Sequence, residues 1–75
     1  MKKITIHTPY ITLGQLLKFA DVIGGGGEAK SYLETHQTFV NDVLDQRRGR
    51  KLYPGDRVNI PPQLSFLIQA GHEDR

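Results

Sequence analysis

Hydrophobic and polar residues alternate near both ends of the chain. At the start, Ile4 and Ile6 are separated by one polar residue, and this period of two is typical of a half-buried strand. Residues 63–69 show the same alternation, and we expect this second strand to pair with the first. Residues 57–60 form a third alternating segment, which a pair of prolines ends.

Between the terminal strands the hydrophobic residues change to helical spacing. They recur at intervals of three and four residues, at Leu13, Leu16, Leu17 and Ala20. Thr12 lies three residues before Gln15, which is the spacing of a capping box, so we expect the first helix to begin after Thr12. A second helix is predicted over residues 28–35. It is too short to be stable alone and must pack against the first.

Turn-forming residues divide the rest of the chain into short strands. Asn41-Asp42 separates predicted strands at 38–41 and 43–45, in a two-residue turn that needs positive φ. Pro54-Gly55 occupies the central positions of a type II turn. The order of elements is one strand, two helices and several short strands. This order predicts an α+β domain in which two short helices pack on a small, mostly antiparallel sheet.

We expect one domain over residues 1–75, with a core motif at 12–60 and a frayed tail at 70–75. At this size a deep catalytic cleft is difficult to build. The absence of cysteine excludes disulfides and fits a reducing compartment. The three histidines lack ligand spacing, so we expect no metal, no cofactor and no enzymatic activity. No segment has the apolar length of a signal peptide or membrane span, which predicts a cytoplasmic protein without a membrane partner.

Four consecutive glycines, at residues 24–27, connect the two predicted helices. Such a run indicates positive φ or the close approach of another group, and a flexible connection is the alternative. The segment GGGGEAKS is also within one residue of a phosphate-binding loop, with Ala29 where the second glycine is required. A nucleotide-binding enzyme is disfavoured because this loop follows a predicted helix rather than a strand. The chain also has no room for a parallel βαβ unit.

Positive charge is concentrated in one segment although the whole chain carries only +2. Residues 46–57 contain five basic residues and a single acidic one. Local charge of this kind attracts anionic partners, but many such runs are no more than solvated surface. Tyr10 and Tyr53 give no signal of function.

The order of these features resembles the S-four RNA-binding domain, a family named after a small-subunit ribosomal protein. The matching residues are Leu16-Leu17-Lys18, Gly27-Glu28-Ala29-Lys30, Leu33, Val40-Asn41, Arg47-Arg48-Gly49-Arg50-Lys51-Leu52, Pro54-Gly55-Asp56 and Val58. Because the flanking segments leave no room for a catalytic domain, the whole chain resembles the stand-alone bacterial members of the YaaA type.

The resemblance implies a non-catalytic, ribosome-associated module that binds structured RNA, either ribosomal or transfer RNA. Its phosphate-binding patch would consist of Lys18, Lys30, Arg47, Arg48, Arg50 and Lys51. Lys30 lies in the first turn of its predicted helix, where unpaired N–H groups attract a phosphate. Recognition by shape is expected, since A-form RNA offers its phosphates and 2′-hydroxyls more readily than its base edges. We expect a monomer rather than a dimer.

The sequence departs from the family pattern at three positions. His36 stands where the family has a helix-ending glycine, which predicts a left-handed conformation at a non-glycine residue. Asp42 replaces a turn glycine, and Thr38 replaces an apolar strand residue. An alternative function is a protein–protein interaction module of β-grasp type, including one within a ribosomal particle. It would use an edge of the sheet or the apolar strand at 64–68.

Overall fold

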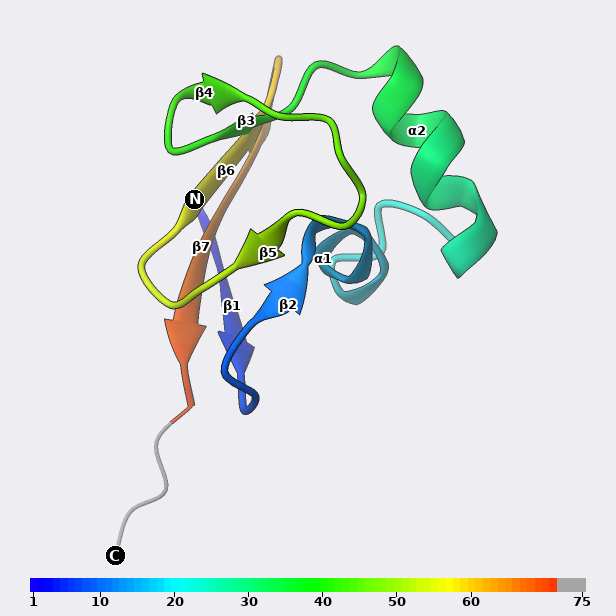
Figure 1. The fold of residues 1–75 in the computed structure, drawn as a ribbon. Helices are drawn as coiled ribbons and strands as arrows, with labels where there is room; N and C mark the ends of the chain where they lie inside the picture. Colours follow the sequence, from blue (N-terminus) through cyan, green and yellow to red (C-terminus); the bar gives the residue numbers. More distant parts are fainter. Residues whose placement is uncertain (72–75) are drawn as a thin grey trace, which may run out of the picture.

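The computed structural model describes residues 1–71 and has two helices beside a small sheet (Figure 1). Its elements in chain order are β1 (Lys2–Ile6), β2 (Ile11–Thr12), α1 (Leu13–Phe19), a 3₁₀ turn (Gly26–Glu28), α2 (Ala29–Thr35), β3 (Phe39–Val40), β4 (Val43–Leu44), β5 (Lys51–Leu52), β6 (Arg57–Ile60) and β7 (Leu64–Ala70). The glycine segment therefore follows a helix, as expected. Within residues 1–71 no helix is long and apolar enough to cross a membrane.

The strands of residues 1–71 form two sheets. The larger has the order β1-β7-β6-β3-β4, and a smaller one pairs β2 with β5. The terminal strands pair as expected, and they run parallel, with Ile4 opposite Ile68. All other pairs are antiparallel, for example Val58 opposite Phe66. The predicted fold class, α+β with a mostly antiparallel sheet, is confirmed.

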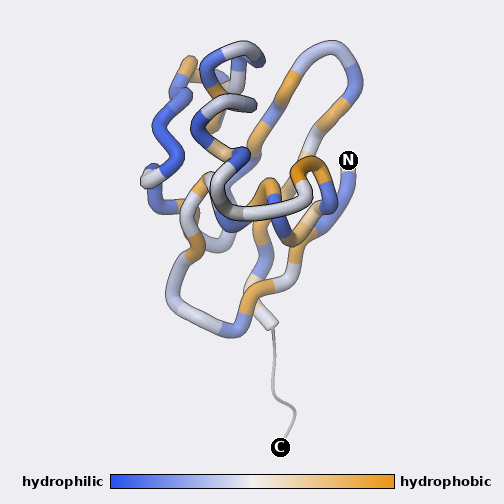
Figure 2. The backbone as a smooth tube through the Cα atoms, turned by 90° about the vertical axis from the view of Figure 1, so that its right-hand side faces the viewer, coloured by the Kyte–Doolittle hydropathy of each residue, from blue (hydrophilic) through white to orange (hydrophobic). Residues whose placement is uncertain are grey.

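One hydrophobic core joins the helices to the sheet. The hydrophobic side chains with at most 2% exposure are Leu13, Leu16, Leu17, Leu33, Val40, Leu52, Val58, Ile60, Phe66 and Ile68. Most of them come from alternate positions of β6 and β7 and from one face of each helix, because these positions point between the layers. Val40 comes from β3 and Leu52 from β5. Figure 2 shows the resulting pattern, in which hydrophobic segments are short and separated by hydrophilic ones.

The predicted capping box starts α1. The Oγ1 atom of Thr12 accepts from the Gln15 N–H at 3.2 Å, and Gln15 Oε1 accepts from the Thr12 N–H at 2.9 Å. Two of the N–H groups at this helix end are thereby satisfied by side chains.

The end of α2 differs from the prediction. His36 has φ −127° and is extended, so the expected left-handed conformation is wrong. The reason is that side chains satisfy the carbonyls of the last turn. Gln46 Nε2 donates to Leu33 O at 2.6 Å and to His36 O at 3.1 Å. The chain can therefore leave the helix directly, and Thr38 is fully buried with its hydroxyl donating to His36 O at 3.2 Å.

Both predicted turns are present. Asn41 and Asp42 have φ of 51° and 71°, so Asp42 takes the positive φ that glycine usually supplies. Gly55 has φ 99°, and the Asp56 N–H donates to Tyr53 O at 2.9 Å. The Asp56 carboxylate links the turns, because it accepts from Asn41 Nδ2 at 3.0 Å and from the Tyr53 N–H at 2.8 Å.

Three of the four glycines in this segment do not show the expected positive φ. Gly24, Gly25 and Gly27 all lack positive φ, and a Cβ atom at Gly25 or Gly27 would meet nothing within 4 Å. Positive φ occurs instead at Asp21, where α1 has ended and φ is 59°. At these glycines the chain does not require the conformational freedom that glycine provides.

The predicted start of the frayed C-terminal tail, at residue 70, is wrong. Ala70 is the last residue of β7, and the Gly71 N–H donates to Ile6 O at 2.7 Å. Both residues, which we predicted to belong to a frayed tail, are therefore part of the sheet region. The rest of that predicted tail, residues 72–75, lies outside the described residues.

Burial predicts that alanine substitutions at two positions on α1 differ in their effect on the free energy of unfolding. Leu16 is fully buried, whereas Phe19 is 60% exposed. Leu16→Ala should lower the free energy of unfolding by about 2–5 kcal/mol because it leaves a cavity. Phe19→Ala, the matched control on the same helix, should change it by no more than about 0.5 kcal/mol. Urea unfolding followed by circular dichroism measures both, and equal losses would contradict the assignment of the core.

Candidate nucleic-acid interface

Residues 45–51, here called the basic loop, lead from β4 into β5 and contain four of the six predicted RNA-binding residues. Its first part is fixed to the end of α2. The Asp45 N–H donates to Thr38 O at 2.8 Å, and Gln46 caps the helix through Leu33 O and His36 O. The Leu33 carbonyl belongs to the last turn of the helix and has no partner within it, so the Gln46 side chain helps to determine where the loop begins.

The second part of the basic loop is fixed to the start of α1. The Leu13 N–H donates to Arg50 O at 2.8 Å, and the Gly14 N–H donates to Arg48 O at 2.9 Å. These are the first two N–H groups of the helix, which have no partner within it. With the capping box satisfying the Gln15 N–H, the loop backbone completes the N-terminal cap of α1. The loop therefore bridges both helices through main-chain groups and one glutamine.

Small residues allow the loop and the helices to meet closely. A Cβ atom at Gly14 would lie 3.4 Å from Arg48 O and 3.5 Å from Ala29 Cβ. The starts of α1 and α2 and the middle of the basic loop thus lie close enough that one added methyl group at Gly14 would contact both neighbours. A Cβ atom at Gly14 would therefore touch the loop, whereas Gly49 has open space where its Cβ would be.

Asp45 organises two of the arginines. Its side chain is only 7% exposed and accepts from Arg47 Nη2 at 2.7 Å and Arg50 Nη1 at 2.9 Å. Arg47 also donates from Nε at 2.9 Å and from its backbone N–H at 3.2 Å. These hydrogen bonds, chiefly those from the Arg47 side chain, hold the pKa of Asp45 well below its usual range. Sequence reasoning missed this counter-ion, which lies one residue before the basic segment.

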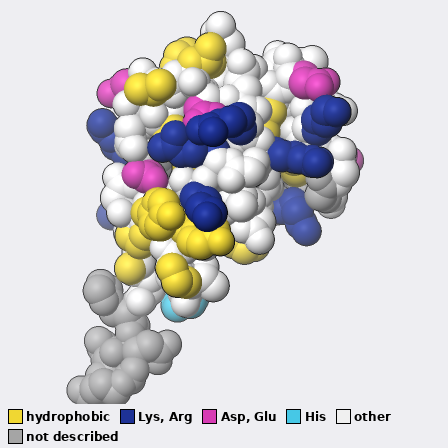
Figure 3. All heavy atoms as spheres, in the orientation of Figure 1, with side chains coloured by type: hydrophobic (Ala, Val, Ile, Leu, Met, Phe, Trp, Pro, Cys, Tyr) yellow, Lys and Arg dark blue, Asp and Glu magenta, His cyan; other side chains and the backbone are white. Residues whose placement is uncertain are grey.

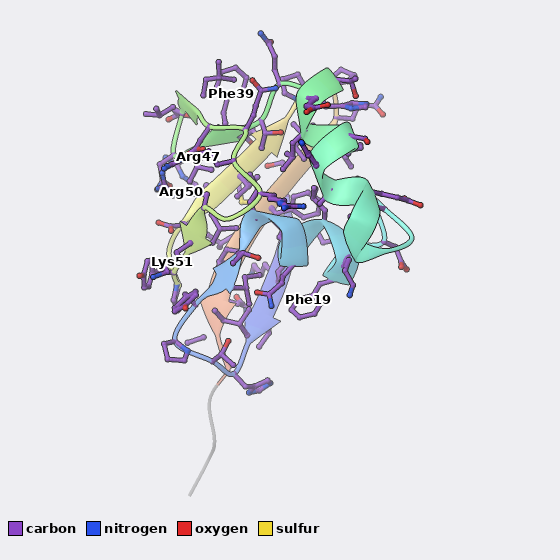
Figure 4. All side chains as sticks on the ribbon, turned by 45° about the vertical axis from the view of Figure 1, so that its right-hand side comes forward. Phe19, Phe39, Arg47, Arg50 and Lys51 are labelled. Atoms are coloured by element: carbon purple, nitrogen blue, oxygen red, sulfur yellow. The ribbon has the colours of Figure 1, made fainter. Side chains whose placement is uncertain are left out.

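Five of the six predicted residues border two surface hollows that share Gly49. Lys18 and Arg48 line one hollow, of about 350 Å³. Arg47, Arg50 and Lys51 line the other, of about 500 Å³. Figure 4 shows these last three residues following one another along one side of the molecule. Figure 3 shows basic side chains across the middle and right of one face, with acidic atoms beside the central group.

Lys30 is the predicted residue that the structure does not bring into these hollows. It is exposed in the first turn of α2, next to Ala29, which lines the first hollow. The start of α2 has no side-chain cap. Lys30 therefore lies beside the hollow that Lys18 and Arg48 line, without lining it.

Comparison with known proteins identifies the family of the chain. A family model of the S4 domain matches residues 4–69. The chain belongs to the S4 domain family. It is also 57% identical over 65 residues to the probable ribosome maturation protein RlbA of Bacillus subtilis (strain 168), an alignment that covers 87% of this chain and 92% of that protein.

This S4 domain carries a further group of side chains that the sequence did not indicate. Lys51 Nζ lies 5.0 Å from the ring centroid of Tyr10, and the Tyr10 and Tyr53 rings are 5.7 Å apart. The two tyrosines meet because β2 pairs with β5, with Ile11 opposite Leu52. Each of these strands has only two residues, which is too short for a periodic signal in the sequence.

The Asp45 contacts predict a pH dependence of the S4 domain's stability. The folded-state pKa is below the unfolded value of about 3.9, so the unfolded state binds a proton first as pH falls. The stabilisation is complete at neutral pH and is lost progressively below about pH 5. Asp45→Asn should therefore lower the free energy of unfolding by about 1–3 kcal/mol at pH 7.

The same variant should make stability less dependent on pH in the acid range. Chemical unfolding at several pH values between about 2 and 7 measures this, since the group titrates there when unfolded. Glu34→Gln, which removes one exposed carboxylate from α2, is the control for loss of a surface charge. A difference between wild type and Asp45→Asn that stays constant down to the lowest pH would contradict the role given to Asp45.

Proposed function

We propose that this S4 domain is a non-catalytic module that binds the phosphate backbone of structured RNA through the basic loop. The observation that carries the proposal is the way the loop is fixed to both helices. Its backbone geometry is set before any ligand arrives, so little conformational entropy is lost on binding. Lys18 and Arg48 then bind phosphates on one side of Gly49, and Arg47, Arg50 and Lys51 bind them on the other.

The chemistry of the side chains suits phosphate. Arg47 remains 73% exposed although it is paired with Asp45, and it uses Nε and Nη2 for that pair. Its Nη1 group is directed away from the carboxylate and can donate to a phosphate oxygen. Asp45 thus orients the arginine and leaves part of its fork for the ligand. Lys30 extends the positive potential over the start of α2.

Ribosomal RNA is the target that we propose, within a maturing ribosomal particle. Membership of the S4 domain family and the similarity to a probable ribosome maturation protein support this choice. Transfer RNA is the other expected class. We also propose that the domain binds as a monomer and that residues 1–75 form one domain.

Crosslinking in cells, followed by sequencing of the bound RNA, tests the proposal. The informative variant replaces Lys18 and Arg48 by alanine, since both are exposed and neither bonds to Asp45. Replacing Arg47 and Arg50 would remove the partners of a buried carboxylate and disturb the loop itself. One structured RNA should be enriched with the wild type and lost in the double variant. The same sparse background with both proteins would contradict RNA binding.

Salt dependence gives a quantitative prediction. About five phosphate contacts should make log affinity fall with log salt concentration with a slope of about −3 to −4. Arg48→Ala should reduce the magnitude of this slope by about 1. Lys3→Ala is the matched control, because Lys3 alternates with buried Ile4 and faces away from the core. Fluorescence anisotropy at several salt concentrations measures the slope, and a flat dependence would point to a partner other than RNA.

One observation favours protein binding as a second candidate function. Val43 and Leu44 on β4, an edge strand of the larger sheet, are 64% and 50% exposed. An exposed hydrophobic edge strand can pair with a strand of another protein. Binding of a protein partner that survives ribonuclease treatment and is lost on Val43→Lys would support this function.

A further inference from the structure

Two exposed tyrosines lie beside the basic loop, next to the paired strands β2 and β5. Tyr10 is 38% exposed and Tyr53 is 48% exposed. They flank the β2–β5 pair on the outer side, whereas Ile11 and Leu52 of the same pair are buried. Tyr10 directly precedes β2 and Tyr53 directly follows β5. Both rings therefore lie at the surface next to a strand pair whose own hydrophobic side chains are buried.

The arrangement of the rings leaves aromatic surface available to a ligand. Their centroids are 5.7 Å apart and their planes are inclined by 49°, so they do not stack face to face on each other. Lys51 Nζ lies 5.0 Å from the centroid of the Tyr10 ring and places a positive charge beside the pair. Flat aromatic rings next to a cation are the combination that single-stranded nucleic acid requires, for stacking and for phosphate attraction.

The tyrosines are continuous with the proposed phosphate-binding surface. Tyr53 lines the same hollow as Arg47, Arg50 and Lys51. Asp56 also borders this hollow, but both oxygens of its carboxylate accept hydrogen bonds, from Asn41 and from the Tyr53 N–H. Figure 3 shows a basic side chain bordered by hydrophobic ones below the central basic group. A strand bound by its phosphates at the loop would therefore bring its next base to the rings.

We propose that Tyr10 and Tyr53 stack against an unpaired nucleotide that adjoins the RNA duplex bound by the basic loop. This inference rests on the proposed RNA binding and specifies its ligand. The bases within a duplex are stacked on one another and cannot reach the rings, whereas an unpaired base can. The preferred ligand is thus a junction between paired and single-stranded RNA. The tyrosines stack on the unpaired base, and the arginines bind the phosphates of the duplex.

The test compares two RNA probes of identical duplex sequence, one blunt and one with a three-nucleotide single-stranded extension. Wild type should bind the extended probe on the order of 10-fold more tightly than the blunt one. Tyr53→Leu and Tyr10→Leu, which keep an apolar side chain but remove the ring, should reduce this ratio toward one. Their affinity for the blunt probe should change far less than their affinity for the extended one, because every basic side chain is kept.

Tyr53→Phe is the matched control and should keep the preference, since it retains the ring. A fluorescent adenine analogue in the extension adds a direct readout, and its quenching should be lost in the leucine variants. If wild type binds both probes equally, the stacking proposal is wrong while RNA binding stands. Equal loss of affinity for both probes in Tyr53→Leu would also overturn it. If wild type binds neither probe, the proposed function fails together with the inference.

Discussion

The hydrogen bonds from the first turn of α1 to the carbonyls of Arg48 and Arg50 are the interaction on which the proposed interface depends. They satisfy helix groups that have no partner inside the helix, and they also fix the backbone from which four basic side chains project. The side chain of Gln46 provides the corresponding link to the end of α2. One loop thus helps to hold two short helices in place, neither of which could be stable by itself.

The basic loop contains a negative charge as well as its positive ones. Asp45 offsets part of the positive charge of the arginines, which lowers their mutual repulsion before a ligand binds. The same carboxylate restricts the directions that Arg47 and Arg50 can take. Arg48, Lys18 and Lys51 do not bond to Asp45 in the described residues, so the surface combines oriented guanidinium groups with cations that can adjust to the ligand.

Patterns of neighbouring residues predicted much of this fold. They failed where residues far apart in the sequence determine the local structure. Thr12 with Gln15, Asn41-Asp42 and Pro54-Gly55 act through neighbours in the sequence, so their caps and turns could be inferred directly. The end of α2 could not, because Gln46 satisfies the carbonyl of Leu33 from 13 residues further along the chain. The basic residues could be named from the family pattern. Their division between two hollows and their hydrogen bonds to Asp45 could not, because they depend on how the chain folds. The meeting of the two exposed tyrosines follows from strand pairing that no local pattern reveals.

Gly49 marks the tip of the basic loop, between the two hollows, and has empty space where a side chain would begin. Its φ is outside the positive region, so the fold would accept another residue there. The lack of a side chain at this point matters for what approaches from outside. Because both hollows share Gly49, a polyanion bound in both of them would pass over this residue. A bulky side chain at position 49 would obstruct such a ligand, although the protein itself leaves open space at this Cβ position.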